Sequence, residues 1–265
     1  MSVVSARKTA RLTFKLKTVE TLFRAIALMA SEDAQRSSRR VTSVNYKKLK
    51  AKIMKIGIIG AGNIGANAAK LFTQAGHEIA VANSRGAETL KDLVAELGQN
   101  ARAASIEEAA QFGEIVFVSI PFGKYETLPT DAFDGKIVID SNNYYPDRDG
   151  QFAALDENKT TSSEMLAEHL RGARVVKGFN TIWFEHLKTQ GDKDLPIGER
   201  RAIFIASDDA EAKKTVGKLI EEIGFAPVDT GSLRDGGEVQ QPETAIYNRN
   251  LTAREAHAIL GSEGY

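Results

Sequence analysis

The sequence has 265 residues, no net charge at neutral pH, 42% hydrophobic and 26% charged residues, and no cysteine. This length and composition indicate a globular protein of one large or two modest domains. The absence of cysteine excludes disulfides, thiolate catalysis and cysteine-ligated metal sites, and it fits a reducing, cytoplasmic location. No apolar run approaches the roughly 18 residues that a membrane helix needs, so we expect no membrane span.

The charge is unevenly distributed along the chain. Residues 1–53 contain 13 Lys/Arg against 3 Asp/Glu, a balance of +10, whereas residues 54–265 contain 22 Lys/Arg against 32 Asp/Glu, a balance of −10. This change in composition predicts a boundary at Met54, between a basic N-terminal extension (1–53) and an acidic body (54–265).

Three interpretations of the extension stay open. Its acid-poor composition, rich in serine and arginine, fits a transit-like or electrostatic tail without fixed structure. Apolar residues at helical spacing between Val19 and Ile26 fit a short helix that docks on the body. The third interpretation is that the natural chain begins at Met54. The extension has no recognisable nucleic-acid-binding fold, so we expect no nucleic-acid partner.

From Met54 onward, strands and helices alternate. An apolar strand over 54–60 leads into a helix over 63–76 with Gly76 as its C′ residue, and a second strand (77–84) leads into a second helix (87–98). The further expected strands cover residues 101–104, 114–121, 136–143, 173–180 and 201–208, and an amphipathic helix (209–223) and a short strand (226–231) follow.

Strands that are apolar along their whole length and separated by helices are typical of a parallel sheet covered on both faces. The predicted fold is therefore α/β: a doubly wound, mainly parallel Rossmann-type sheet with a small C-terminal extension.

A glycine-rich turn follows the first strand. Gly60, Gly62 and Gly65 form the pattern G-x-G-x-x-G between a strand and a helix, the context in which it binds dinucleotides. The first glycine permits a tight turn, the second lets the backbone approach a pyrophosphate, and the third lets the helix pack on the strand. Asn63 and Ile64 complete the turn, so these five residues are expected to bind the cofactor.

The end of the second strand indicates which cofactor binds. NAD enzymes usually carry an acid here that accepts hydrogen bonds from the ribose hydroxyls and would repel a 2′-phosphate. This strand ends in Asn83, Ser84 and Arg85, with no acid before Glu88. Because an arginine offers a fixed fork of donors to phosphate, the sequence predicts NADP.

Polar side chains at the ends of later strands are expected to line the ligand cleft, since ligands lie beyond the carboxyl ends of parallel strands. Small polar side chains there indicate contacts with the nicotinamide ring or its amide. The residues in these positions are Ser119, Ile120 and Pro121, then Ser141, Asn142 and Asn143, then Gly178, Phe179, Asn180 and Thr181.

Six segments in order, IGIIGAGNIGANAA, ANSRG, SIPF, DSNN, ARVVKGFNTI and VDTGSL, resemble the NADP-dependent oxidoreductases that use the deazaflavin coenzyme F-420. They are equally similar to the oxidoreductase domain of the six-transmembrane epithelial antigen of prostate metalloreductases. The resemblance spans about residues 54–250. In those metalloreductases an attached membrane domain receives the electrons; because this sequence shows no such segment, we expect a small-molecule acceptor.

The resemblance implies hydride transfer between NADPH and a flavin or deazaflavin, so FMN, FAD or coenzyme F-420 would be the second substrate. Such chemistry needs orientation more than a catalytic acid or base. We therefore expect positioning by Asn142, Asn180 and Thr181 and no catalytic residue. The four histidines lie far apart in the sequence, so no metal site is expected.

The resemblance also implies where the acceptor lies. It would stack near Phe179–Ile182 and under Thr230–Leu233, where Gly231 and Ser232 would offer backbone donors and Leu233 an apolar contact. Asn143 is counted among the same substrate residues. The segment 144–161 departs from both families, and its aromatic and charged residues suit a lid or a partner-specific loop.

Two further alternatives stay open. A C-terminal helix is expected to start at Thr252, and its apolar stripe through Ala256, Ile259 and Leu260 suits either a homodimer contact or packing on the chain's own sheet. The alternative function is that of a non-catalytic NADP-binding redox sensor, whose acceptor pocket would be filled by side chains or a lid.

Replacing Arg85 by alanine is expected to weaken NADPH binding by about 1–3 kcal/mol, as for the loss of a charged hydrogen-bonding partner. NADH lacks the 2′-phosphate, so its affinity should stay nearly unchanged. Calorimetric titration with both cofactors checks this, and equal losses for the two would contradict the assignment of Arg85 to the 2′-phosphate.

Overall fold

The computed structural model describes residues 52–261. All but the last two residues of the predicted basic extension lie outside the described residues. Within the described range, every helix is too short or too polar to cross a bilayer.

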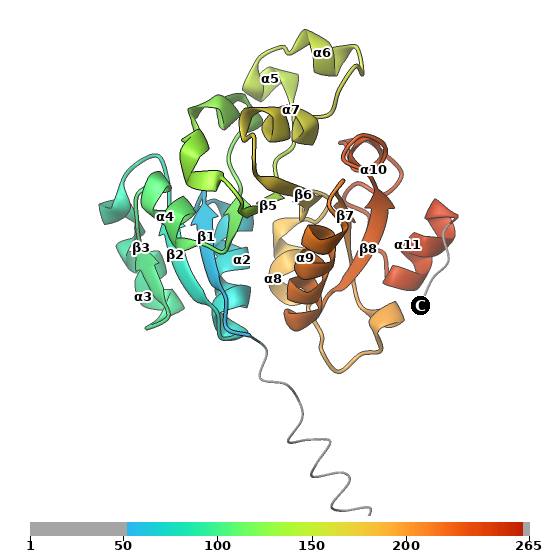
Figure 1. The fold of residues 1–265 in the computed structure, drawn as a ribbon. Coiled ribbons are helices and arrows are strands. Elements are labelled where there is room, and N and C mark those ends of the chain that lie inside the picture. The colour runs from blue at the N-terminus through green and yellow to red at the C-terminus, as the bar shows by residue number, and fades with distance from the viewer. Residues whose placement is uncertain (1–51, 262–265) are drawn as a thin grey trace, which may run out of the picture. The chain divides into compact units, whose positions relative to one another are not determined.

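An eight-stranded sheet forms the centre of the described body (Figure 1). Its order is β3-β2-β1-β4-β5-β6-β7-β8, and all neighbours are parallel except β6 and β7. The strands are β1 (Lys55–Ile59), β2 (Glu78–Ala82), β3 (Ala101–Ala103), β4 (Ile115–Val118), β5 (Ile137–Asp140), β6 (Arg174–Gly178), β7 (Ala202–Ala206) and β8 (Ala226–Gly231). The predicted mainly parallel sheet is confirmed.

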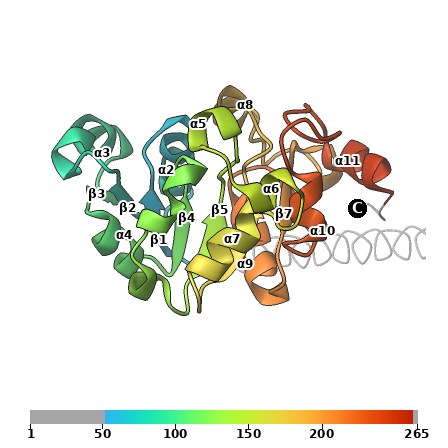
Figure 2. The same cartoon turned by 90° about the horizontal axis from the view of Figure 1, so that it is seen from above.

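Helices cover both faces of the sheet, as the view from above shows (Figure 2). One apolar layer lies between the sheet and α2 (Asn63–Gln74), α3 (Lys91–Leu97), α8 (Phe184–Thr189) and α9 (Ala210–Glu222). The opposite layer packs against α4 (Ile106–Phe112), α7 (Ser162–His169) and two 3₁₀ turns, η2 (Phe122–Thr127) and η3 (Thr130–Phe133). The sheet is therefore doubly wound.

The inner strands β1, β4 and β5 are almost entirely buried, and nearly every residue in them is apolar. In β1, Ile56 and Ile58 belong to the first layer and Ile59 to the second, and all three are fully buried. Successive side chains of a strand point to opposite faces, so a strand covered on both faces needs apolar residues at every position.

Two details differ from the sequence-based expectation. The second helix is divided into a 3₁₀ turn, η1 (Ala87–Leu90), and α3. The last two strands run opposite to the others, and β6 pairs with β7 only at Lys177–Ala206 and Gly178–Ile205. The reason is that the long connection through α8 and the 3₁₀ turn η4 (Ile197–Glu199) starts β7 at the end of the sheet where β6 finishes.

The C-terminal part packs on the chain's own sheet. After α10 (Asp235–Val239), α11 (Ala253–Leu260) starts at Thr252 as predicted, with Thr252 and Glu255 forming a reciprocal cap. Ala253 and Ala256 are buried against β7 and β8. Ile259, in contrast, is 48% exposed, so the predicted stripe is only partly used within the chain.

Asp209 joins β6 to the start of α9. Its carboxylate accepts hydrogen bonds from the Ala212 amide at 2.9 Å, as the N-cap of α9, and from Arg174 Nε at 2.6 Å and Nη2 at 2.9 Å. The Arg174 hydrogen bonds, with the Ala212 amide next, hold the pKa of Asp209 well below its usual range.

Replacing Asp209 by alanine is expected to lower the free energy of unfolding at neutral pH by about 0.5–2 kcal/mol, the range for a lost N-cap. Because the folded pKa is depressed, this stabilisation is present above the unfolded pKa of about 3.9 and is lost as the pH falls below it. Urea denaturation at several pH values should show the gap between wild type and D209A closing in acid.

The matched control is Asp209→Asn, which keeps the cap and removes the charge. Since the Arg174 and Asp209 side chains are 38% and 35% exposed, solvent screens this ion pair. Asp209→Asn should therefore cost less than D209A. If D209A lowers the free energy of unfolding by the same amount at neutral and acidic pH, the ionised Asp209 carboxylate is not the source of the stabilisation.

Candidate functional site

The three glycines of the first turn have different surroundings. Gly60 has φ +102°, and a Cβ built there would lie 2.0 Å from the Ser119 carbonyl oxygen. A Cβ on Gly65 would lie 1.8 Å from the Gly60 carbonyl oxygen, whereas a Cβ on Gly62 would meet nothing within 4 Å. The first and third glycines therefore allow α2 to approach β1 and β4, and the second faces open space.

That open space adjoins the N-terminus of α2. Gly62 is the N-cap, no side chain caps the helix, and the first turn contains no acid. The first turn includes the exposed Asn63 and the half-buried Ile64. Unpaired N–H groups and the positive end of the helix dipole favour an anion here, so the turn fits a pyrophosphate.

The loop after β2 has a fixed shape. Asn83 Oδ1 accepts a hydrogen bond from the Arg85 amide at 2.9 Å, and Asn83 Nδ2 donates to Thr89 Oγ1 at 2.9 Å. Thr89 Oγ1 in turn donates to the Gly86 carbonyl at 2.8 Å. Asn83 therefore shapes this loop through its side chain.

The loop presents two polar side chains to solvent. Ser84 and Arg85 are both exposed, and within residues 52–261 the Arg85 guanidinium has no hydrogen-bonding or ionic partner. A free guanidinium fork next to the glycine turn fits a 2′-phosphate. The nearest following acid, Glu88, lies beside Gly86, since a Cβ built on Gly86 would lie 2.5 Å from its carboxylate.

The ends of β4 and β5 are joined through Asn142. Its Oδ1 accepts a hydrogen bond from the Ile120 amide at 2.8 Å, while Asn142 Nδ2 is buried and has no partner among the described residues. Ser141 is buried, and its hydroxyl donates to the Val118 carbonyl at 2.9 Å, so Ser141 braces the two strands. Ser119 is half-buried and Pro121 is exposed.

Two charged residues lie beneath Asn142 that the sequence reasoning missed. Asp140 ends β5, Lys177 lies in β6, and both side chains are 0% exposed. Burial lowers the pKa of Lys177, and the nearby Asp140 charge partly offsets this. The available signal was an acid at the end of the apolar run "IVID" and a lysine directly after the apolar pair Val175–Val176.

The ends of β5 and β6 hold each other through two asparagines. Asn143 Nδ2 donates to the Asn180 carbonyl at 2.9 Å, and Asn180 Nδ2 donates to Asn143 Oδ1 at 3.1 Å. Asn180 Nδ2 also donates to the Gln240 carbonyl at 2.8 Å, and Gln240 Nε2 donates to Thr230 Oγ1 at 2.8 Å. The buried Thr181 accepts the Asn248 amide through its carbonyl at 3.1 Å. The structure thus brings the predicted residues of β5, β6 and β8 together.

The acceptor was expected to stack near Phe179–Ile182, but the Phe179 ring lies in the core and offers no exposed face for stacking. Phe179 is 0% exposed, and its ring makes edge contacts with Phe72 and Phe117 at centroid distances of 6.2 and 5.2 Å. The residue has φ +64°, an uncommon left-handed conformation for an aromatic side chain. This turn places the ring in the core and the next residue, Asn180, at the strand end. Ile182 is also buried in the core.

The groups after β8 that were expected to contact the acceptor mostly contact other residues of the chain. The Gly231 amide donates to Asp229 Oδ1 at 2.8 Å, so that donor is not available to an acceptor. Leu233 is buried in the second apolar layer. Ser232 is half-buried, and its hydroxyl donates to Asp235 at 3.1 Å.

Segment 144–161 folds as two short helices, α5 (Pro146–Asp149) and α6 (Ala153–Asp156), above the strand ends (Figure 1). It contacts the site directly, because Arg148 Nη2 donates to the Asn143 carbonyl at 2.6 Å. The Tyr145 hydroxyl also hydrogen-bonds that of Tyr247, to which Asn143 Nδ2 donates at 3.4 Å. A pocket of about 390 Å³ lies between this segment and residues 234–243.

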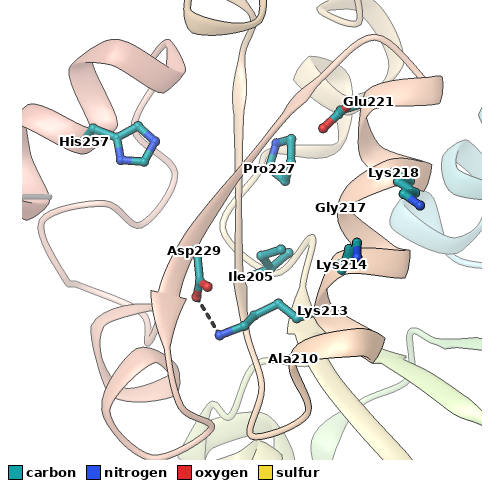
Figure 3. A pocket seen from close by; sticks show the side chains of 10 residues that line it. All are labelled: Ile205, Ala210, Lys213, Lys214, Gly217, Lys218, Glu221, Pro227, Asp229 and His257. Carbon is teal, nitrogen blue, oxygen red and sulfur yellow. Dashed lines mark hydrogen bonds and ion pairs between the residues drawn. The ribbon is translucent and has the colours of Figure 1, made fainter. Parts of the chain in front are cut away.

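A larger, open groove of about 730 Å³ lies between α9 and α11 (Figure 3). Its lining includes Lys213, Lys214, Lys218 and His257, and Lys213 is paired with Asp229 at 2.8 Å. None of the predicted site residues lines this groove, so we assign it no part in cofactor binding.

The different surroundings of Gly62 and Gly65 generate a prediction. Gly62→Ala should leave the unfolding temperature nearly unchanged, because its Cβ meets nothing, yet should weaken NADPH binding by about 1.5–3 kcal/mol by blocking a charged hydrogen bond. Gly65→Ala, the matched control, should destabilise the fold by about 1–3 kcal/mol through overpacking. Thermal unfolding and calorimetry together check both. Unchanged NADPH affinity in G62A would contradict the pyrophosphate assignment.

Comparisons with known proteins agree with this geometry. Residues 55–144 match the family described as NADP oxidoreductase coenzyme F420-dependent. Metalloreductase STEAP3 of Rattus norvegicus is 30% identical over 188 residues, which are 70% of this chain and 36% of that protein. The chain thus spans little more than a third of that relative's length.

Solved structures show the same fold. A hypothetical protein, SMa0349 from Sinorhizobium meliloti, is 31% identical with a TM-score of 0.66, and the match covers 76% of this chain and 96% of that one. A putative F420-dependent NADP-reductase from Arthrobacter sp. FB24 is 23% identical with a TM-score of 0.59, covering 70% of this chain and 89% of that one. The chain is therefore similar to the coenzyme F420-dependent NADP oxidoreductases, whose family model matches residues 55–144, and to the STEAP metalloreductases.

Proposed function

We propose that this protein transfers a hydride between NADPH and a flavin or deazaflavin: FMN, FAD or coenzyme F420. The observation that carries the proposal is the uncapped N-terminus of α2 beside the free guanidinium of Arg85. The first suits a pyrophosphate and the second a 2′-phosphate, so the two together suit NADP.

In this proposal the chain's own residues bind and orient. The α2 amides hold the pyrophosphate, and Ser84 and Arg85 hold the 2′-phosphate. Asn142, fixed by the Ile120 amide, offers its unpartnered Nδ2 to the nicotinamide carboxamide. NADPH supplies the hydride when bound, and the protein needs no acid or base for the transfer itself.

A flavin-type acceptor is favoured by electron balance. A hydride carries two electrons, whereas a metal ion such as ferric iron takes one, so reduction of a metal by this chain would pass through a flavin or deazaflavin. The related STEAP3 is named a metalloreductase, but this chain spans only 36% of it. For the acceptor itself, Asn143, Asn180, Thr181 and Ser232 stay proposed contacts.

A non-catalytic NADP-binding redox sensor is the second candidate. It is favoured by the hydrogen bonds at the ends of β5 and β6, where the side chains of Asn143 and Asn180 bond to each other and to the main chain. The Tyr247 hydroxyl also accepts from Asn143 Nδ2 at 3.4 Å and hydrogen-bonds the Tyr145 hydroxyl. In a sensor this arrangement would stay closed with NADPH bound, and no acceptor would reach the nicotinamide.

The test is NADPH oxidation by the full chain, followed by dihydronicotinamide absorbance with FMN, FAD and coenzyme F420 offered separately. We expect turnover with one of the three, and a loss of kcat in Asn142→Ala. The exposed Asn250, replaced by alanine, is the matched control and should leave kcat unchanged. Tight NADPH binding without turnover on any of the three would contradict the proposal and support the sensor.

A further inference from the structure

A network of two opposite charges and a hydroxyl lies under the end of β5. Lys177 Nζ and Asp140 Oδ2 are 3.9 Å apart, too far for a direct hydrogen bond. The Ser163 hydroxyl, from α7, lies between them: it donates to Asp140 Oδ2 at 2.6 Å and accepts from Lys177 Nζ at 3.1 Å. All three residues are fully buried.

The network converges on the main chain of Asn142. The Asn142 amide donates to Asp140 Oδ1 at 3.0 Å, and the Asn142 carbonyl accepts from Lys177 Nζ at 3.3 Å. Both peptide groups that flank the Asn142 side chain are therefore fixed by buried charges.

The side chain of Asn142 is fixed as well. Because the Ile120 amide is a donor, the atom that it contacts at 2.8 Å must be Oδ1, which fixes the other atom as Nδ2. Asn142 is 2% exposed, and its Nδ2 has no partner among residues 52–261. A buried amide donor without a partner is costly, so its presence points to a ligand acceptor.

We propose that Asp140, Ser163 and Lys177 are positioning residues, whose buried network holds Asn142 Nδ2 toward the carbonyl oxygen of the nicotinamide carboxamide. This inference rests on the cofactor placement proposed above. A buried ion pair contributes little net stability compared with an apolar pair of similar volume, whereas it fixes geometry well when every polar group is satisfied.

The alternative is that the network only holds β5, β6 and α7 together. Two adjacent serines of α7 separate these accounts. Ser162 and Ser163 are both 0% exposed, but the Ser162 hydroxyl lies at the hydrogen-bond limit, 3.5 Å from Lys177 Nζ, and does not contact Asp140. Replacing either serine by alanine removes one hydroxyl from α7. Only Ser163→Ala removes the hydroxyl that bridges Lys177 and Asp140.

The experiment measures binding of NADP⁺ and of 2′-phospho-ADP-ribose, which lacks the nicotinamide, by calorimetry on the full chain. In Ser163→Ala we expect NADP⁺ affinity to fall about threefold to tenfold, as for one lost hydrogen bond, and 2′-phospho-ADP-ribose affinity to change less than about twofold. Ser162→Ala should leave both affinities unchanged. Asn142→Ala should reproduce the Ser163→Ala pattern.

Equal losses for both ligands in Ser163→Ala, or equal effects of the two serine variants, would overturn the inference. If Ser163→Ala does not fold, the neutral double variant Asp140→Asn/Lys177→Met gives the same comparison without an unpaired buried charge. Wild-type protein that binds 2′-phospho-ADP-ribose as tightly as NADP⁺ would also overturn it. Absence of flavin turnover contradicts only the proposed acceptor, because this test reads cofactor binding alone.

Discussion

The close approach of α2 to the ends of β1 and β4 is the constraint on which the rest of the site depends. Side chains at Gly60 or Gly65 would overlap backbone atoms, so the approach requires two residues without a Cβ. It places the free amides of the first helical turn at the carboxyl ends of the parallel strands, where Gly62 leaves the space open. The packing of α2 on β1 and β4 thus creates a phosphate-binding surface from backbone amides alone, without any side chain.

The remaining strand ends are tied together by polar side chains, and these ties explain why the site is ordered. Asn142 joins β5 to the loop after β4, Asn143 and Asn180 join β5 to β6, and Gln240 links Asn180 to β8. Lys177 and Asp140 support this layer from below. The positions that would hold a nicotinamide are thus fixed by contacts between residues far apart in the sequence.

The sequence predicts the local features of this arrangement well. The glycine turn, the loop with Arg85 and the polar strand ends are each contained in a short segment, so spacing and composition suffice. Features that depend on tertiary packing carry no such local signal. Phe179 follows a strand like a cleft residue, but its left-handed backbone turns the ring into the core. Tyr247, 102 residues from its partner Tyr145, carries no local signal.

The most direct test is a crystal structure of the full chain with NADP⁺ bound. We expect the pyrophosphate at the N-terminus of α2, the 2′-phosphate in hydrogen-bonding contact with Ser84 and Arg85, and the carboxamide oxygen at Asn142 Nδ2. A cofactor whose 2′-phosphate points away from Arg85, or whose nicotinamide lies apart from Asn142, would contradict it.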